Sequence, residues 1–418
     1  MEATNRSAEP TAPPPVVESA AAVASVLGDD DLLREILLRL GFPTCLVRAA
    51  AVSKRWLRHA SDPTFLRRFR ARHPPRLLGF YVSHPGLLRH LFVSLPQPPE
   101  LAVPLRRAVS SCFEDLTKYK PVVMDCRNGR LVIDFFDGIP WYPLRLALLR
   151  VLHTREPASI VPRIPPLPRP SASEAPGVHT YIHHKFILDD GGGDGVTLVN
   201  LSHAGGRVSA YVYVLQPDGW SIPTMGVTEL PDPETVYLNL LSPVHGNIYL
   251  SASATPGYVL GLNLTDARFF ILELPDGVSG NFNLSRAEGS GLYLVHANRF
   301  QLSVWHHRMD GDPAQGWLLV DTFWVLDVCK HFPNQNWVSA DSEHTGRVSV
   351  VAVGDNAEFV FLDIEETGVV VHVHLKSRTA KKVYQRMPGN QSPASIFPLM
   401  MIWPPVFPAS NEEHDQGE

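Results

Sequence analysis

Apolar residues recur with a helical period near the N-terminal end of the chain. The stripe consists of Leu32, Leu33, Ile36, Leu37 and Leu40. This spacing places the five side chains along one side of an α-helix. The aspartates from Asp29 to Asp31 supply an N-cap and negative charge at the positive end of the helix dipole. Gly41 and Pro43 are expected to end this helix.

Two further helices are predicted directly downstream. Thr44 can cap the second helix, whose apolar side carries Leu46, Ala49, Val52, Ser53 and Trp56. Asp62 and Pro63 are typical of the cap and first residue of a third helix. Three short helices within about fifty residues bury too little apolar surface to be very stable alone. We therefore expect this unit to need a partner.

From about residue 77 onward, the pattern changes to short runs of β-branched and aromatic residues bounded by Gly, Pro, Asn and Asp. A weak phrase recurs in which a turn residue precedes an alternating apolar strand, with aliphatic positions at Leu131, Val208, Ile248, Leu292 and Val348. These positions are about 77, 40, 44 and 56 residues apart, so the first gap resembles two units. Periods of about forty to fifty residues are typical of β-propeller blades.

One such unit can be followed in detail. Strands are predicted over residues 246–250, 258–264 and 269–274, with turn residues between them and Pro275-Asp276-Gly277 after the last. Similar triplets follow at Leu292, 302–306 and 317–320. We expect an all-β domain of about six blades, with a β-sandwich or barrel as the alternative architecture.

The helical segment resembles an F-box in order, spacing and residue type over three consecutive helices. The resemblance is carried by Leu27, the aspartates, Leu32-Leu33, Glu35-Ile36-Leu37, Arg39-Leu40, Leu46, Arg48-Ala49, Val52, Lys54-Arg55-Trp56, Ser61-Asp62-Pro63 and Phe65-Leu66. A core-facing helix of a larger domain would explain the leucine stripe alone, but not the helix of Trp56 and the Asp-Pro-x-Phe turn as well. Gly28 stands where the family usually has proline, and Ser53 where cysteine is frequent. Gly28 should loosen the start of the first helix.

This resemblance implies binding of a Skp adaptor, which bridges to a cullin scaffold in an SCF-type ubiquitin ligase. The adaptor-contact role is carried over to Leu27, Leu32, Leu33, Ile36, Leu37, Leu40, Leu46, Val52 and Trp56. Some of these must instead fill the core of the small module, and the sequence leaves open which. The β region resembles the F-box-associated β-propeller or kelch-like domains of plant F-box proteins, especially the large grass group. The expected fold is therefore α+β and multidomain, a three-helix F-box followed by a propeller.

The same patterns indicate the domain organisation. Residues 1–25 are rich in Ala, Pro and Glu and are expected to form a disordered arm. Residues 26–75 form the F-box, residues 76–408 the substrate-recognition domain and residues 409–418 a disordered acidic tail. The proline-rich stretch 157–176 is expected to be a long exposed loop between blades.

Composition limits the compartment and the classes of partner. With 418 residues, 44% of them hydrophobic, the chain can bury a sizeable core, and a net charge of −5 indicates no attraction to nucleic acid or to an anionic membrane. The basic run 67–76 is better explained as a solvated helix face. Cys45, Cys112, Cys126 and Cys329 are scattered, which favours a reducing compartment over disulfides or structural zinc. We expect a soluble cytoplasmic or nuclear protein.

A search for catalytic chemistry yields little. The histidine pairs 183–184 and 306–307 are adjacent on strands and point to opposite faces, while His372 and His374 share a face without an acidic partner in that strand. Residues 189–195 lack the ligand pattern of a phosphate or calcium loop. We predict no catalytic residue, cofactor or metal, and a protein substrate of unknown identity. The alternative is a propeller-type enzyme or carbohydrate-binding protein, which requires a deep axial pocket lined with carboxylates and aromatic residues.

Overall fold

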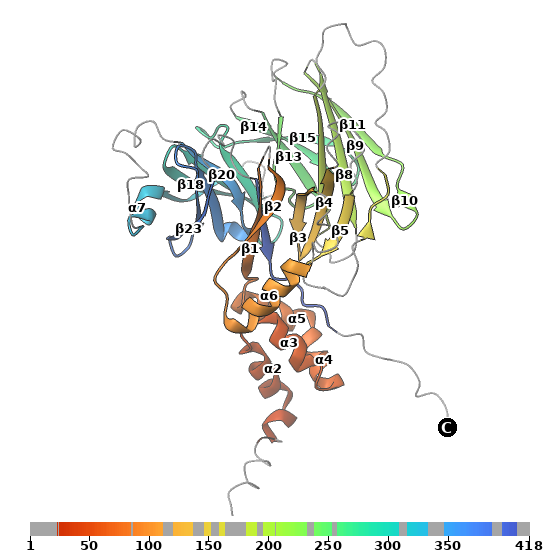
Figure 1. The fold of residues 1–418 in the computed structure, drawn as a ribbon, viewed down its shortest axis with the longest axis vertical. Helices are drawn as coiled ribbons and strands as arrows, with labels where there is room; N and C mark the ends of the chain where they lie inside the picture. The colour runs from red at the N-terminus through yellow and green to blue at the C-terminus, as the bar shows by residue number, and fades with distance from the viewer. Residues whose placement is uncertain are drawn as a thin grey trace, which may run out of the picture. The chain divides into compact units, whose positions relative to one another are not determined.

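The computed structural model describes most of the chain (Figure 1). The described residues are 23, 25–84, 87–111, 120–136, 146–151, 159–163, 181–189, 195–204, 206–231, 238–252, 257–308, 316–332, 347–386 and 395–407. Nearly all of the predicted N-terminal arm, the acidic tail and most of the stretch 157–176 therefore lie outside the described residues. By internal contacts the chain divides into two compact units, Met1–Arg76 together with Ile402–Glu418, and Leu77–Met401. Residues 402–407 group with the helices, although we placed them in the β domain.

The first unit contains short helices, and its bounds are α2 (Asp30–Leu38), α3 (Pro43–Ala50), α4 (Lys54–Ser61) and α5 (Pro63–Arg72). The predicted caps at both ends of this series are present. The Asp29 carboxylate accepts hydrogen bonds from the amides of Asp31 and Leu32, and Asp62 accepts one from the amide of Phe65. Each cap satisfies amide donors that have no partner within their own helix.

The middle of this unit differs from the prediction. Pro43 is the first residue of α3, after Phe42 as N-cap, so Pro43 does not act as a stop and Thr44 does not cap the helix. Proline is favoured at this position because its missing amide would have no partner there. The predicted second helix is also two helices, because the chain leaves the helical conformation after α3. Ser53 then caps α4 by accepting a hydrogen bond from the Trp56 amide at 3.2 Å.

The second unit is a six-blade β-propeller, as predicted. Three four-stranded blades follow one another in the order of the chain. The first contains β12 (Leu238–Leu240), β13 (Asn247–Ala252), β14 (Tyr258–Asn263) and β15 (Phe269–Glu273), and the second contains β16 (Phe282–Arg286), β17 (Leu292–Asn298), β18 (Gln301–His307) and β19 (Leu318–Trp324). The third contains β20 (Val348–Val353), β21 (Phe359–Ile364), β22 (Val369–His374) and β23 (Thr379–Gln385). The neighbouring strands in each blade are antiparallel.

Two further blades precede these in the chain. They contain β3 (Lys120–Arg127), β4 (Arg130–Phe136), β5 (Leu146–Arg150) and β6 (Ser159–Ile160), then β7 (Tyr181–Leu188), β8 (Val196–Ala204), β9 (Arg207–Gln216), β10 (Gly219–Trp220) and β11 (Thr224–Glu229). The domain also contains the helices α6 (Pro99–Ser111) and α7 (Val325–Cys329) and the short 3-10 helix η3 (Asp355–Ala357), which no local pattern predicted.

The last sheet joins the two ends of the propeller. Strand β1 (Leu77–His84) pairs on one side with β2 (Leu87–Ser94) and on the other with β24 (Ser395–Met400), both antiparallel. A strand from the C-terminal end of this domain therefore completes a sheet begun at its N-terminal end. Such closure leaves no open edge between the first and last blades.

The predicted repeat marked five of the six sheets, did not mark the closing sheet of β2, β1 and β24, and misjudged the spacing. Leu131 lies in β4 and Val208 in β9, which belong to consecutive blades, so the first gap is one unit and the interpretation as two units is wrong. The repeated phrase marks a tight turn before a strand, as positive φ angles at Gly129, Gly206 and Gly246 show. Because such turns occur at several strand junctions of a blade, the phrase does not identify one fixed strand.

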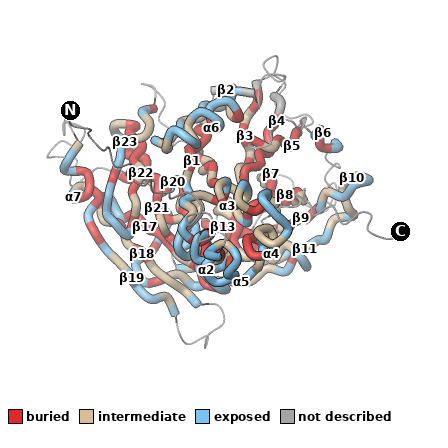
Figure 2. Tube along the Cα trace, turned by 90° about the horizontal axis from the view of Figure 1, so that it is seen from below, coloured by how far each residue is buried: buried red, intermediate tan, exposed pale blue. Residues whose placement is uncertain are grey.

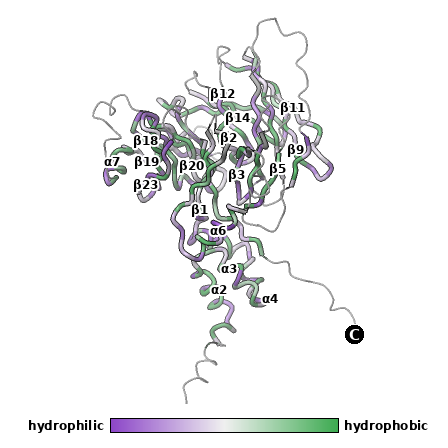
Figure 3. The backbone as a smooth tube through the Cα atoms, in the orientation of Figure 1, coloured by the Kyte–Doolittle hydropathy of each residue, from purple (hydrophilic) through white to green (hydrophobic). Residues whose placement is uncertain are grey.

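The propeller core is built between neighbouring blades. Figure 2 shows buried stretches along the strands, and one cluster joins Leu302 and Val304 of β18 to Val360 and Leu362 of β21. Figure 3 shows hydrophobic and hydrophilic stretches along the same chain, and β21 is buried at all six positions. Polar side chains bridge the same junctions. Asn281, for example, accepts a hydrogen bond from the Val350 amide at 2.9 Å.

Candidate functional site

Helix α2 carries the predicted contact residues on two different sides. Leu33 and Leu37 are completely buried in the core of the helical unit, and Leu38 joins them. Leu32 and Ile36 are 46% and 36% exposed. The helix is therefore amphipathic toward its own core, and it also presents two large aliphatic side chains on a solvent-facing side.

The remaining predicted contact residues divide in the same way. Leu46 is fully buried, while Leu40 and Trp56 are partly buried against the same core. Leu27 is half-buried and Val52, just after α3, is 67% exposed. The structure thus leaves Leu32, Ile36 and Val52 as the large aliphatic residues of the predicted set that are open to solvent.

Arg55 connects α4 to the start of α2. Its guanidinium donates hydrogen bonds to the Leu27 carbonyl at 2.6 Å, to the Gly28 carbonyl at 2.8 Å and to the Asp30 carboxylate at 2.8 Å. These bonds fix the backbone around Gly28, where the sequence predicted a loose start to the helix. Sequence analysis placed Arg55 in the motif but did not assign it this role.

His59 extends this network into the core. The ring is buried, its Nδ1 accepts a hydrogen bond from Arg34 Nε at 3.2 Å, and its Nε2 lies 3.0 Å from the Asp30 carboxylate. Because Nδ1 accepts, the ring proton is on Nε2, which donates to Asp30. Hydrogen bonds from Arg55 and then from His59 lower the pKa of Asp30. The carboxylate is thereby held ionised at the N-terminus of α2, where the helix dipole also favours negative charge.

This arrangement can bind but offers little chemistry. Leu32 and Ile36 are held on the capped helix α2, Val52 lies in the turn after α3, and the nearby Asp30 carboxylate is paired with Arg55 and His59. A small preorganised apolar surface of this kind is suited to receiving the helices of another protein.

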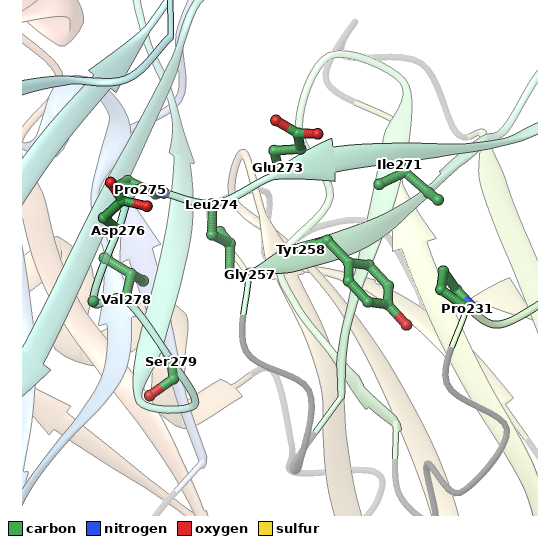
Figure 4. A pocket seen from close by; sticks show the side chains of 11 residues that line it. Pro231, Gly257, Tyr258, Ile271, Glu273, Leu274, Pro275, Asp276, Val278 and Ser279 are labelled. Atoms are coloured by element: carbon green, nitrogen blue, oxygen red, sulfur yellow. The ribbon is translucent and has the colours of Figure 1, made fainter.

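One cavity of the propeller, with a volume of about 560 Å³, is shown in Figure 4. Its wall consists of β14 and β15 residues and the turn that follows, with Tyr258, Ile271 and Leu274 beside the carboxylates of Glu273 and Asp276. A second cavity of about 550 Å³ is lined by Phe323, Trp324, Asp327, His331 and Arg378, among others. The first lining comes mainly from β14, β15 and the turn after β15, and the second from β19, α7 and the turn before β23.

The histidines singled out from the sequence contact neighbouring side chains of the propeller. The His372 ring packs in tilted arrangements against the rings of Phe359 and Phe361, and burial lowers its pKa to about 4. His374 Nε2 lies 4.0 Å from the carboxylate of Glu358, which directly follows η3 and was not predicted as a partner. Within the described residues, no group of three or more His, Cys, Asp or Glu side chains is placed to hold a metal ion.

His183 and His184 differ in environment, as neighbouring residues of a strand should. Burial lowers the pKa of His183, whereas His184 is exposed and bonded to the Asn200 side chain. In His306 and His307 burial likewise lowers the pKa.

None of the helices in the described part of the chain has the length and apolar character needed to cross a membrane.

Comparison with known proteins gives two family matches. Residues 122–407 match the family described as F-box protein AT5G49610-like, beta-propeller, and residues 29–68 match the F-box domain. F-box protein At5g07610 of Arabidopsis thaliana is 40% identical over 74 residues, which are 17% of this chain and 17% of that protein. Among solved structures, the nidogen/laminin complex contains a similar chain with a TM-score of 0.37 at 13% identity, over 76% of this chain and 97% of that one.

Proposed function

Because this chain belongs to the AT5G49610-like β-propeller family of F-box proteins, we propose that it is the substrate receptor of an SCF-type ubiquitin ligase. The helical unit docks on a Skp adaptor, which connects it to a cullin scaffold. The propeller holds a protein substrate close to the ubiquitin-charged enzyme on that scaffold. Typical sites of substrate contact are the loops of a rigid domain, and the residues that would read a substrate here are not assigned.

The single observation that carries this proposal is the exposure of Leu32, Ile36 and Val52 on a small helical unit. Complete burial of one such side chain contributes roughly 1.5–3 kcal/mol. Covering these three side chains with a partner would therefore contribute favourably to binding. This also accounts for why the sequence carries more apolar residues here than the unit's own core uses.

The receptor acts by proximity and supplies no acid, base or metal of its own. Binding substrate and ligase to one chain raises the local concentration of substrate lysines beside the charged enzyme, which converts a bimolecular encounter into an effectively intramolecular one. We accordingly assign it no cofactor and no catalytic residue. We place its action in the cytoplasm or nucleus, with neither nucleic acid nor membrane as a partner.

The test is adaptor binding by variants that change only exposed positions. Ile36→Asp and Val52→Asp each place a charge on the proposed docking surface without disturbing the core, and we expect each to weaken binding of a purified Skp adaptor at least tenfold. Ile271→Asp is the matched control, because Ile271 is 53% exposed on the propeller. Leu37→Asp is unsuitable, since it would place a charge in the core of the unit.

Wild-type adaptor affinity for both Ile36→Asp and Val52→Asp would refute the docking surface. If the wild-type chain does not bind the adaptor, the proposed function is refuted. Circular dichroism of each variant shows whether the helices remain intact, so that a loss of binding is assigned to the surface and not to unfolding.

A further inference from the structure

The helical unit contains side chains from the far end of the chain. Trp403 and Phe407, a few residues after β24, pack against the core cluster formed by α2, α3, α4 and α5. They belong to the same compact unit as the helices, although Phe69 and Trp403 lie about 330 positions apart in the sequence. In Figure 1 the blue end of the described chain runs past α5.

Trp403 packs at the aromatic centre of α5. Its ring is stacked on Phe69 with the planes inclined by 6° and the centroids 6.1 Å apart. The centroid of the Phe69 ring also lies 6.1 Å from that of Phe65 and 4.7 Å from that of His73, and Phe69 is completely buried. The indole is therefore part of the packing around this buried ring.

The same aromatic group holds α5 against α2. The His73 ring, beside Phe69, is hydrogen-bonded through Nε2 to the Leu38 carbonyl at 2.8 Å. That bond satisfies one of the carbonyls left without a partner at the C-terminal end of α2. Trp403 therefore supports, through Phe69 and His73, the end of the helix that carries Leu32 and Ile36.

We propose that residues 402–407 are an integral part of the docking module and that Trp403 is a positioning residue for it. The F-box motif is continuous in the sequence, but the folded module is not. A chain that ends before residue 402 would retain every adaptor-contact residue, but we expect its helix α5 to be held less firmly. The consequence for adaptor binding rests on the proposed function, whereas the consequence for α5 does not.

Amide hydrogen exchange of the full-length chain tests the structural part. In Trp403→Ala, we expect exchange of the amides in 63–72 to accelerate at least tenfold, with the propeller strands β13, β14 and β21 unchanged. Trp403→Phe retains an aromatic ring over Phe69 and should recover most of the protection. Trp324→Ala is the matched control, because Trp324 is 50% exposed on the propeller and should leave α5 unchanged.

Adaptor binding tests the functional part. We expect Trp403→Ala to weaken binding of a purified Skp adaptor at least threefold, and Trp403→Phe to restore it. Unchanged exchange in α5 on Trp403→Ala overturns the inference, as does acceleration that spreads equally through the propeller. Accelerated exchange with unchanged adaptor affinity overturns the positioning role. If wild-type protein does not bind the adaptor, the proposed function fails, and the exchange result still decides whether 402–407 complete the module.

Discussion

Removing the Asp363 carboxylate should strongly destabilise the blade formed by β20 to β23. Asp363 of β21 is completely buried and lies 3.1 Å from the guanidinium Nε of Arg386, whose side chain is only 2% exposed. Arg386 also donates to the Glu365 carbonyl at 2.8 Å. The site is tight, because a Cβ on Gly368 would lie 2.9 Å from Arg386 Cβ. Asp363→Ala leaves the arginine in this enclosed site without its counterion.

Breaking a buried ion pair from one side costs about 3–5 kcal/mol, since the remaining charge stays desolvated. The Arg68 and Glu35 pair gives the matched contrast. Its side chains are 58% and 49% exposed and 3.1 Å apart, so Glu35→Ala should cost less than about 1 kcal/mol. Both substitutions remove the carboxylate of an arginine–carboxylate pair, one buried and the other exposed.

Urea unfolding of the full-length chain measures both variants: the near-ultraviolet signal of the propeller reports Asp363→Ala, and the far-ultraviolet helical signal reports Glu35→Ala in the other unit. The double variant Asp363→Leu with Arg386→Met removes both charges together, and we expect it to be more stable than Asp363→Ala. A loss below about 1 kcal/mol for Asp363→Ala would show that the pair is not desolvated as the structure indicates. A double variant no better than the single one would refute the uncompensated charge as the cause.

Three further predictions follow from particular contacts. Arg55→Lys cannot reach all three acceptors at the start of α2, so it should cost the helical unit about 1–2 kcal/mol in urea unfolding, with Arg58→Lys as the neutral control. Burial lowers the pKa of His372 to about 4, so as the pH falls this histidine is protonated in the unfolded chain before it is protonated in the folded protein. The contribution of His372 to the free energy of unfolding should be constant above pH 7 and fall by roughly 3 kcal/mol between pH 6.5 and 4. His372→Gln should flatten that slope. Gly226→Ala would place a Cβ against the Ala267 carbonyl, so a lower melting temperature is expected, and an unchanged one would contradict this close approach.

Local signals in the sequence determined much of the fold. The Asp29 and Asp62 caps, the amphipathic stripe of α2 and the strands around residues 246–274 depend on neighbours within a few positions, so the periodic pattern was sufficient to place them. The local strand and turn pattern marked five of the blades, whereas the sixth sheet forms only when β24 from the C-terminal end of the domain pairs with β1. Local patterns failed where two signals competed, as at Pro43, which can end one helix or begin the next.

Only the tertiary structure decided which apolar residues are available to a partner. Leu32 and Leu33 are adjacent and chemically identical, yet one is 46% exposed and the other fully buried, because only one faces the packed core of the unit. The support of α5 by Trp403 was equally invisible, since no periodicity connects residues about 330 positions apart. An amphipathic pattern predicts on which side of its helix an apolar side chain lies. It does not predict against which side the rest of the chain packs, because that depends on contacts between residues far apart in the sequence.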